Sequence, residues 1–308
     1  MSRAQHWTPD QIGDLRGRTV LVTGANSGIG LETVLVLARH NARVILTSRD
    51  HSRLDAATAR IRAIRPNAKL TTMMMDLGDL ASVRAAVERL AETETIHILI
   101  NNAGVMNLPE RITTKDGLEA TVATNHLGHF ALTLGLLPAL RRAGRARVVT
   151  VSAIAARWRS GALDDLMSEK RYRPMGAYAK SKRANVVFTQ ELARRLAGTG
   201  IEAVVVHPGA AMTNLQRSTQ SRGQRLFTRF AARALMGSPE AAAWPTLYAA
   251  TSADVCSGQF IGPAGRRQDS GTPKPVRLPR GADDPKEGRR LWEASLRLTA
   301  TEDPFARA

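Results

Sequence analysis

The chain is poor in several residue types, and each scarcity narrows the class of protein. Its 308 residues include one cysteine, Cys256, which excludes an internal disulfide and favours a reducing compartment. The longest apolar stretch, Phe130 to Leu140, is about half of the roughly 20 residues that span a bilayer. The polar N-terminal sequence MSRAQHWTPDQ contains no signal-peptide core. We therefore expect a soluble, cytoplasmic protein without a membrane span.

Acidic and aromatic residues are also scarce, and both shortages bear on nucleic-acid binding. Lys and Arg number 44 against 27 Asp and Glu, giving a formal net charge of +17, while aromatics are only 4%. Groove-binding proteins concentrate their cations on one element beside stacking aromatics, whereas these arginines are spread along the chain. We expect no specific nucleic-acid partner, but a positive surface that attracts anions, including phosphorylated cofactors.

Short apolar runs rich in β-formers alternate with longer segments of helical period. The predicted strands are 19–23, 43–47, 69–74, 96–100, 147–151 and 201–207, with a late edge strand at 259–262. The helical patterns between them include 31–40, 53–64, 80–92 and 117–140. This alternation predicts an α/β fold, a Rossmann-type doubly wound parallel sheet with helices on both faces. Ligands of such sheets bind at the C-terminal ends of the strands.

The domain organisation follows from composition. No linker rich in proline and glycine divides the first 265 residues, so the sequence predicts a single domain over 1–265. The remainder, 266–308, is predicted as an irregular basic tail that ends in a short helix near 289–298 and packs on the same domain. Apolar residues between 210 and 236 recur at helical spacing, which predicts a lid helix.

A glycine-rich turn follows the first predicted strand and opens the first helix. Its sequence is Thr23-Gly24-Ala25-Asn26-Ser27-Gly28-Ile29-Gly30. In that context Gly24 permits a tight turn, Gly28 lets the backbone approach a pyrophosphate, and Gly30 lets the helix pack on the strand. The helix N-terminus offers free N–H groups and partial positive charge to phosphates. The turn predicts a dinucleotide site formed by Gly24, Asn26, Ser27, Gly28, Ile29 and Gly30.

Five short motifs succeed one another at strand ends or in helices. They are Thr-Gly-x-x-x-Gly-x-Gly from Thr23, Asn-Asn-Ala-Gly at 101–104, Thr-Asn-His at 124–126, Tyr-x-x-x-Lys at 178–182, and His-Pro-Gly at 207–209 with Thr213. Each is weak alone, but in this order they resemble the short-chain dehydrogenase/reductase family. The segments 125–130, 178–185 and 291–295 look like its retinol-dehydrogenase-like branch, which includes many bacterial members of unassigned substrate. The resemblance implies a nicotinamide cofactor and an oxidoreductase acting on CH-OH groups.

The second strand ends in residues that bear on the choice of cofactor. NAD-preferring relatives usually place an acid where Ser48 stands, whereas Ser48 leaves room for a 2′-phosphate that Arg49 can pair with. We therefore expect NADP(H) rather than NAD(H), although Arg49 could be an ordinary surface arginine. By resemblance, further cofactor contacts are Asp76 and Leu77 at the adenine, Asn101 near its ribose, and Ala103, Gly104, Tyr178, Lys182, Pro208, Gly209 and Thr213.

Tyr178 and Lys182 lie four residues apart, so on a helix they share one face. Because a nearby ammonium favours the phenolate, we expect the pKa of Tyr178 to lie below its usual value of about 10. Tyr178 would give a proton to a carbonyl oxygen or take one from an alcohol. The resemblance implies that Lys182 also bonds the nicotinamide ribose, and that Asn125 anchors a water that relays protons from Lys182.

The catalytic serine of the family is missing. Relatives in this branch read Ser-Ser after the fifth strand, with the second serine catalytic, and counting back from Tyr178 places Ala153 there. Its neighbour Ser152 should point to the other face of the strand. Three interpretations stay open. A backbone shift or bulge could bring Ser152 into play, a water or Thr150 could substitute, or the protein could bind cofactor with weak or no turnover.

The remaining expectations concern substrate, metal and partners. A lid at 210–236 with an apolar inner face suits a lipophilic aldehyde or ketone and its alcohol, although the same pattern fits a helix packed on a neighbouring subunit. The resemblance suggests a homo-oligomer, dimer or tetramer. His126 and His129 share a helix face without a third ligand nearby, so we expect packing or surface roles and no metal site. Trp158 and Trp244 could line a substrate pocket or belong to the core.

Overall fold

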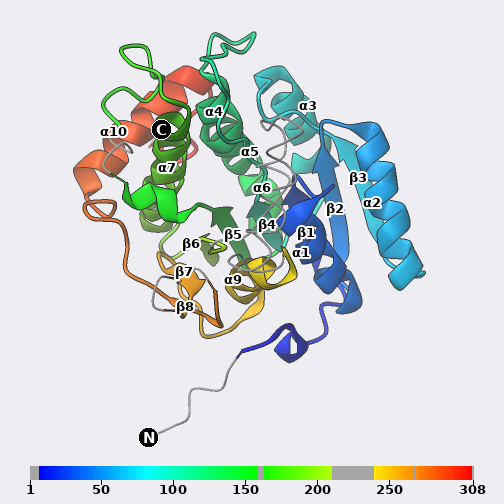
Figure 1. Ribbon diagram of the computed structural model, residues 1–308. Helices are drawn as coiled ribbons and strands as arrows, with labels where there is room; N and C mark the ends of the chain where they lie inside the picture. The colour runs from blue at the N-terminus through cyan, green and yellow to red at the C-terminus, as the bar shows by residue number, and fades with distance from the viewer. Residues whose placement is uncertain (1–6, 159–162, 210–238, 266–267, 269, 307–308) are drawn as a thin grey trace, which may run out of the picture.

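The computed structural model describes residues 7–158, 163–209, 239–265, 268 and 270–306. Its centre is an eight-stranded sheet in the order β3-β2-β1-β4-β5-β6-β7-β8, with helices packed on both faces (Figure 1). All neighbours from β3 to β7 pair in parallel, while β8 runs antiparallel to β7. The strands are β1 (Thr19–Thr23), β2 (Arg43–Ser48), β3 (Leu70–Met74), β4 (Ile98–Asn101), β5 (Ala146–Val151), β6 (Ile201–Val206), β7 (Phe260–Pro263) and β8 (Pro273–Pro275).

The helices cover the two faces of the sheet, which confirms the predicted Rossmann-type fold. One face carries α1, α2 and α9, and the other carries α3, α5, α7 and α10. Their bounds are α1 (Gly28–Arg39), α2 (His51–Ile64), α3 (Leu80–Ala91), α4 (Ala120–Val122), α5 (Gly128–Gly135), α6 (Leu137–Arg141), α7 (Pro174–Arg195), α9 (Pro239–Thr251) and α10 (Pro285–Thr299). Short turns are η1 (Pro9–Gln11), the π-helical η2 (Ala123–Leu127) and the 3-10 turn η3 (Ile154–Arg157).

Two apolar cores lie on the two faces of the sheet. Val149 and Val151 of β5 belong to the core beneath α1 and α9, while Val148 belongs to the core beneath α7. Every residue of β1 is buried, because a central parallel strand is covered on both sides. No helix in the described part of the chain is long and apolar enough to cross a bilayer.

The helical pattern predicted over 117–140 forms helix from Ala120 onward, but not as one regular α-helix. It contains α4, the π-turn η2, α5 and α6 in succession. The turn widens the helix at Asn125, and α5 ends at Gly135 before Pro138, whose ring nitrogen cannot donate a hydrogen bond. The apolar pattern does not reveal either break, because nearly every residue of the segment is buried.

The tail prediction also needs correction, since 266–308 contains a strand and a 15-residue helix. Strand β8 begins and ends with proline, which an edge strand tolerates because half of its N–H groups face away from the sheet. Helix α10 starts at Pro285, earlier than expected, where the Asp284 side chain accepts from the backbone N–H of Lys286. It lies along α7 (Figure 1) and buries Trp292 against Phe188.

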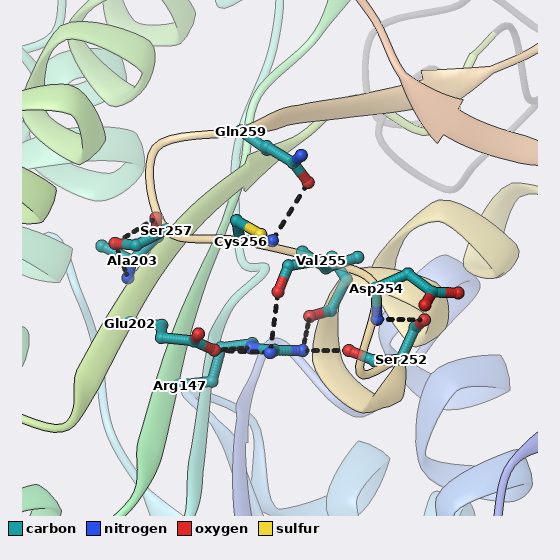
Figure 2. A network of polar contacts seen from close by, with 10 residues as sticks. Arg147, Glu202, Ala203, Ser252, Asp254, Val255, Cys256, Ser257 and Gln259 are labelled. Carbon is teal, nitrogen blue, oxygen red and sulfur yellow. Dashed lines mark hydrogen bonds and ion pairs between the residues drawn. The ribbon is translucent and has the colours of Figure 1, made fainter.

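Arg147 joins three elements at the N-terminal edge of the sheet. Its guanidinium pairs with Glu202 of β6, and it donates to the backbone oxygens of Ala249 at 2.9 Å, Ser252 at 2.8 Å and Val255 at 3.1 Å (Figure 2). These carbonyls lie in the last turn of α9 and just beyond it, where helices leave oxygens unpaired. The cation therefore caps α9 and fastens it to β5 and β6, at the end of the sheet opposite the glycine-rich turn.

Candidate active site

A cavity of about 730 Å³ lies at the C-terminal ends of the strands. Most residues that the sequence assigns to cofactor or catalysis line it: Gly24, Asn26, Ser27, Gly28, Ile29, Gly30, Arg49, Asp76, Leu77, Ala103, Gly104, Ser152, Tyr178, Lys182, Pro208 and Gly209. Asn101 and Asn125 are buried behind this lining. Thr213 and the lid expected at 210–236 lie outside the described residues.

The turn between β1 and α1 has the geometry that its glycines predict. Gly24 has a φ of 62°, in the left-handed region that favours glycine. A Cβ on Gly30 would lie 2.5 Å from both the backbone oxygen of Gly24 and Nδ2 of Asn102, so no side chain fits between α1 and the ends of β1 and β4. This close approach brings the N-terminus of α1 to the cavity wall.

The N-terminus of α1 lacks the side-chain cap that its neighbours have. Asp50 caps α2 and Asp79 caps α3, whereas Ser27, the N-cap residue of α1, makes no side-chain capping bond. The first-turn N–H groups of α1 therefore keep donors available at a site of partial positive charge. Such a terminus fits the pyrophosphate of a dinucleotide.

The side chain of Asn101 does not line the cavity, and its expected position near the adenosine ribose stays a prediction. Its side chain is fully buried and donates to Oγ1 of Thr133 on α5 at 2.9 Å. The neighbouring Asn102 lines the cavity instead, and its Nδ2 donates to the backbone oxygen of Thr23 at 2.8 Å. Successive strand residues face opposite sides, so the motif alone did not indicate which asparagine reaches the cavity.

Two cations lie where β2 meets α2. Arg49 is exposed and lines the cavity beside the buried Ser48, and Arg53 in the first turn of α2 also lines it. The one acid between them, Asp50, caps α2 and pairs with Arg53, Nε to Oδ2, at 3.1 Å. Sequence reasoning missed Arg53, although its place three residues after the N-cap Asp50 is a usable signal. Asp50 is therefore already paired within α2, and this edge of the cavity suits an anion.

Tyr178 and Lys182 lie on one face of α7, as their spacing predicts. Lys182 is buried, and its Nζ donates to the backbone oxygen of Val151, at the end of β5, at 3.0 Å. Burial lowers the pKa of Lys182 to about 8. The Nζ atom lies 5.8 Å from the centroid of the Tyr178 ring.

The pKa of Tyr178 runs opposite to the expected direction. Burial raises it to about 12, so the phenol is neutral at pH 7. The reason is that taking the hydroxyl out of water disfavours the phenolate, and this outweighs any attraction to the ammonium of Lys182. The side chain is therefore a proton donor in the state that the structure describes.

Asn125 stands one layer behind the cavity, in the π-turn η2. Its Oδ1 accepts from the backbone N–H of Val105 at 2.7 Å. Its Nδ2 donates to the backbone oxygen of Val105 and to Oγ of Ser181, each at 2.9 Å. Because Val105 belongs to the cavity wall and Ser181 precedes Lys182, Asn125 joins that wall to the catalytic turn of α7.

The end of β5 contains no hydroxyl free to meet a substrate. The Oγ of Ser152 is buried and donates to the backbone oxygen of Lys182 at 2.7 Å, so its proton points into α7. Thr150 is fully buried and does not line the cavity. Ala153, which does line it, offers only a methyl group at the position where the family resemblance implies a serine.

The cavity wall near Tyr178 is apolar. Ile154, Trp158 and Met175 are among the most exposed large apolar residues of the described chain, and all three line the cavity. Trp244, the other tryptophan considered for a pocket, instead packs edge-on against Trp7, with ring centroids 6.5 Å apart. The sequence could not separate the two tryptophans, because their burial depends on distant segments.

Residues 18–224 match the family described as short chain dehydrogenase. The chain belongs to this family. It is 39% identical to human retinol dehydrogenase 13 over 298 residues, covering 94% of this chain and 87% of that protein. It is therefore an NAD(P)-dependent oxidoreductase acting on CH-OH groups, with relatives in the retinol-dehydrogenase-like branch.

Two solved structures are similar to this chain over most of its length. An uncharacterized protein from Mycobacterium paratuberculosis has a TM-score of 0.79 and 38% identity, covering 97% of this chain and 100% of that one. A short chain oxidoreductase from Pseudomonas aeruginosa PAO1, solved with NADPH and described as containing an atypical catalytic center, has a TM-score of 0.63 and 25% identity. That match covers 80% of this chain and 95% of the other.

Proposed function

We propose that this protein is an NADP(H)-dependent oxidoreductase that interconverts a lipophilic aldehyde or ketone and its alcohol. The observation that carries the proposal is the layout of one cavity. The uncapped N-terminus of α1 and the cations Arg49 and Arg53 line one part, and Tyr178 beside an apolar wall lines another. When bound, the cofactor supplies or accepts the hydride, and a family assignment to CH-OH oxidoreductases agrees with that chemistry.

Tyr178 exchanges the proton in this proposal. A phenol that is neutral at pH 7 donates to the oxygen of a carbonyl as the alcohol forms, which favours reduction over oxidation. Lys182 orients the cofactor and carries charge close to Tyr178, and Asn125 holds the cavity wall against α7. The apolar wall of Ile154, Trp158 and Met175 selects uncharged, lipophilic substrates by burying their surface.

The preference for NADP(H) rests on Ser48, Arg49 and Arg53. Arg49→Ala should weaken NADPH binding by about 1.5–3 kcal/mol, the usual worth of a hydrogen bond to a charged group, and should leave NADH binding unchanged. Calorimetric titration with both cofactors measures this. Arg62→Ala is the matched control, because Arg62 is an exposed arginine in the last turn of α2, the helix that follows Arg49. NADH binding as tight as NADPH binding in the wild type would refute the preference.

The alternative function, a cofactor-binding protein with weak or no turnover, follows from Ala153. Ala153→Ser should raise kcat on a reactive aldehyde by up to about 10²-fold, the usual effect of one preorganised donor. Ser152→Ala should change kcat little, because its hydroxyl is bonded to the backbone of α7. A panel of aldehydes, ketones and alcohols tests both variants and the wild type. If none of the three proteins turns over any substrate while NADPH binds, the oxidoreductase proposal fails and the alternative stands.

Subunit organisation and location stay proposals drawn from the family resemblance and from the sequence. We propose a homo-oligomer, dimer or tetramer, of the cytoplasm. Light scattering on the purified chain determines the oligomeric state, and a monomer at micromolar concentration would contradict the first part.

A further inference from the structure

His129 is a buried histidine for which the proposed function has no use. It lies on α5, one helical turn after Asn125, and its side chain is 1% exposed. Its Nε2 is 2.8 Å from Oγ1 of Thr23, at the end of β1, and its Nδ1 is 3.0 Å from the backbone oxygen of Asn125. The ring therefore bridges the strand that opens the cofactor turn and the π-turn that carries Asn125.

The partners of Thr23 determine the direction of its bond to His129. Oγ1 of Thr23 accepts the backbone N–H groups of Asn102 and Ala103, each at 2.9 Å. A hydroxyl has two acceptor lone pairs and one proton. With both lone pairs occupied, the proton has two acceptors within reach, Nε2 of His129 at 2.8 Å and the backbone oxygen of Ile100 at 3.4 Å, and the shorter contact is the stronger hydrogen bond. The hydroxyl of Thr23 therefore donates to Nε2 of His129, which must be unprotonated.

The other nitrogen has the opposite role. The backbone oxygen of Asn125 can only accept, so Nδ1 of His129 must carry a proton. Burial lowers the pKa of His129 to about 3, and the ring is neutral at physiological pH. Only the tautomer with the proton on Nδ1 satisfies both contacts.

The contact of His129 with Asn125 falls inside the π-turn η2, where a hydrogen bond of the wider i→i+5 spacing, from Gly128 to Ala123, interrupts the α-helix. Nδ1 of His129 supplies a proton to the carbonyl of Asn125, within that turn. From Asn125 the contacts continue through its Nδ2 to Ser181, whose Oγ donates to the backbone oxygen of Tyr178 at 2.8 Å.

We propose that His129 is a positioning residue which, as the Nδ1–H tautomer, links the cofactor turn at Thr23 to Asn125 and so to the turn of α7 that carries Tyr178 and Lys182. Every hydrogen bond along this line donates in the same direction, from the N–H groups of Asn102 and Ala103 toward α7. The effect on catalysis rests on the proposed function, whereas the tautomer and the linkage do not.

The tautomer is tested without any turnover. Protein labelled with ¹⁵N at histidine is examined by long-range ¹H–¹⁵N spectroscopy between pH 5 and 8, and the loss of one signal in His129→Asn assigns the resonance. The expected result is a neutral Nδ1–H ring throughout, which is distinctive because free histidine favours the Nε2–H form. An Nε2–H ring, or an imidazolium within this range, overturns the proposal.

The linkage is tested by a pair of variants of similar polarity. Asparagine at 129 places its amide donor near the position of Nδ1, whereas glutamine places an amide oxygen near that of Nε2. His129→Asn keeps a donor for the backbone oxygen of Asn125 and loses the contact with Thr23, so its kcat should fall less than that of His129→Gln. His129→Gln should lose up to about 10²-fold, the usual effect of misplacing a catalytic group by about 1 Å.

Controls separate this proposal from the proposed function. NADPH binding by calorimetry and the fraction folded by circular dichroism are measured for both variants, and kcat is expressed per folded molecule. The pH profile of kcat should shift in His129→Gln and not in His129→Asn. Equal kcat in the two variants, or a larger loss in His129→Asn, overturns the positioning role. If the wild type shows no turnover, the proposed function is refuted instead. The tautomer measurement then tests the linkage.

Discussion

Two cations lie at opposite ends of β5, Arg147 partly buried and Lys182 buried, and their surroundings differ. Arg147, at the N-terminal end, pairs with Glu202 and donates to three backbone oxygens (Figure 2). Lys182, packed against the C-terminal end, donates to one backbone oxygen, that of Val151, and makes no ion pair with any described residue. Arg147 has its hydrogen-bonding capacity filled by the protein, whereas Lys182 keeps most of its capacity free.

The difference separates stability from function along a single strand. A cation whose donors are all matched holds elements together, and at Arg147 these elements are α9, β5 and β6. A buried ammonium with one acceptor is destabilising, which is why burial lowers the pKa of Lys182 to about 8. Its unused donors are available to a ligand in the cavity. Perturbed groups of this kind are typical of active sites.

Replacing Lys182 by methionine, which has a similar length and no charge, should give the largest effect. We expect Lys182→Met to reduce kcat by about 10²–10⁴-fold, the range for acid–base groups. The same change should raise the free energy of unfolding by about 1 kcal/mol, because an unmatched buried charge is replaced by an apolar group. The oxygen of Val151 keeps a bond from Nδ2 of Asn185 at 3.2 Å. Urea unfolding and steady-state kinetics measure both, and a less stable variant would contradict this interpretation of Lys182.

The matching substitution at the other end of the strand should have the opposite pattern. Arg147→Met should destabilise the protein by about 1.5–3 kcal/mol, the usual worth of a hydrogen bond to a charged group, because the ion pair is only partly buried and Glu202 can be hydrated once unpaired. The side chain of Glu202 is 37% exposed. NADPH affinity and kcat per folded molecule should be unchanged, and the exposed neighbour Arg145→Met serves as control. A loss of kcat without a loss of stability would contradict the comparison of Arg147 with Lys182.

The pH dependence of stability follows from the shifted pKa values of Lys182 and Tyr178. Between pH 8 and 10 the unfolded chain protonates Lys182, whose usual pKa is 10.5, while the native chain does not, so stability rises with pH by up to about 1.4 kcal/mol per unit. Above pH 10 the raised pKa of Tyr178 reverses the trend, because only the unfolded chain loses that proton. Unfolding curves for the wild type and Lys182→Met measure the difference. Parallel profiles for the two proteins would show that Lys182 is not the titrating group.

The candidate site could be predicted from sequence to the extent that its residues belong to local motifs. Gly24 and Gly30 follow a strand and open a helix, and that context alone defines their geometry. Arg53 belongs to no motif, so the sequence does not indicate it, and Asn101 and Asn102 belong to the same motif, which does not distinguish them. His129 was assigned to packing or surface, since its bridging role depends on Thr23, over a hundred positions earlier.

The sequence by itself determined the order of strands and helices, the glycine-rich turn and the pairing of Tyr178 with Lys182. These are features of period and spacing, which the chain carries locally. Only the tertiary structure decided which atoms are buried and what they meet there. It reversed the expected pKa shift of Tyr178, turned the hydroxyl of Ser152 into α7, and fixed the tautomer of His129. The physical reason is that desolvation and hydrogen-bond matching depend on segments that are remote in sequence and adjacent in space.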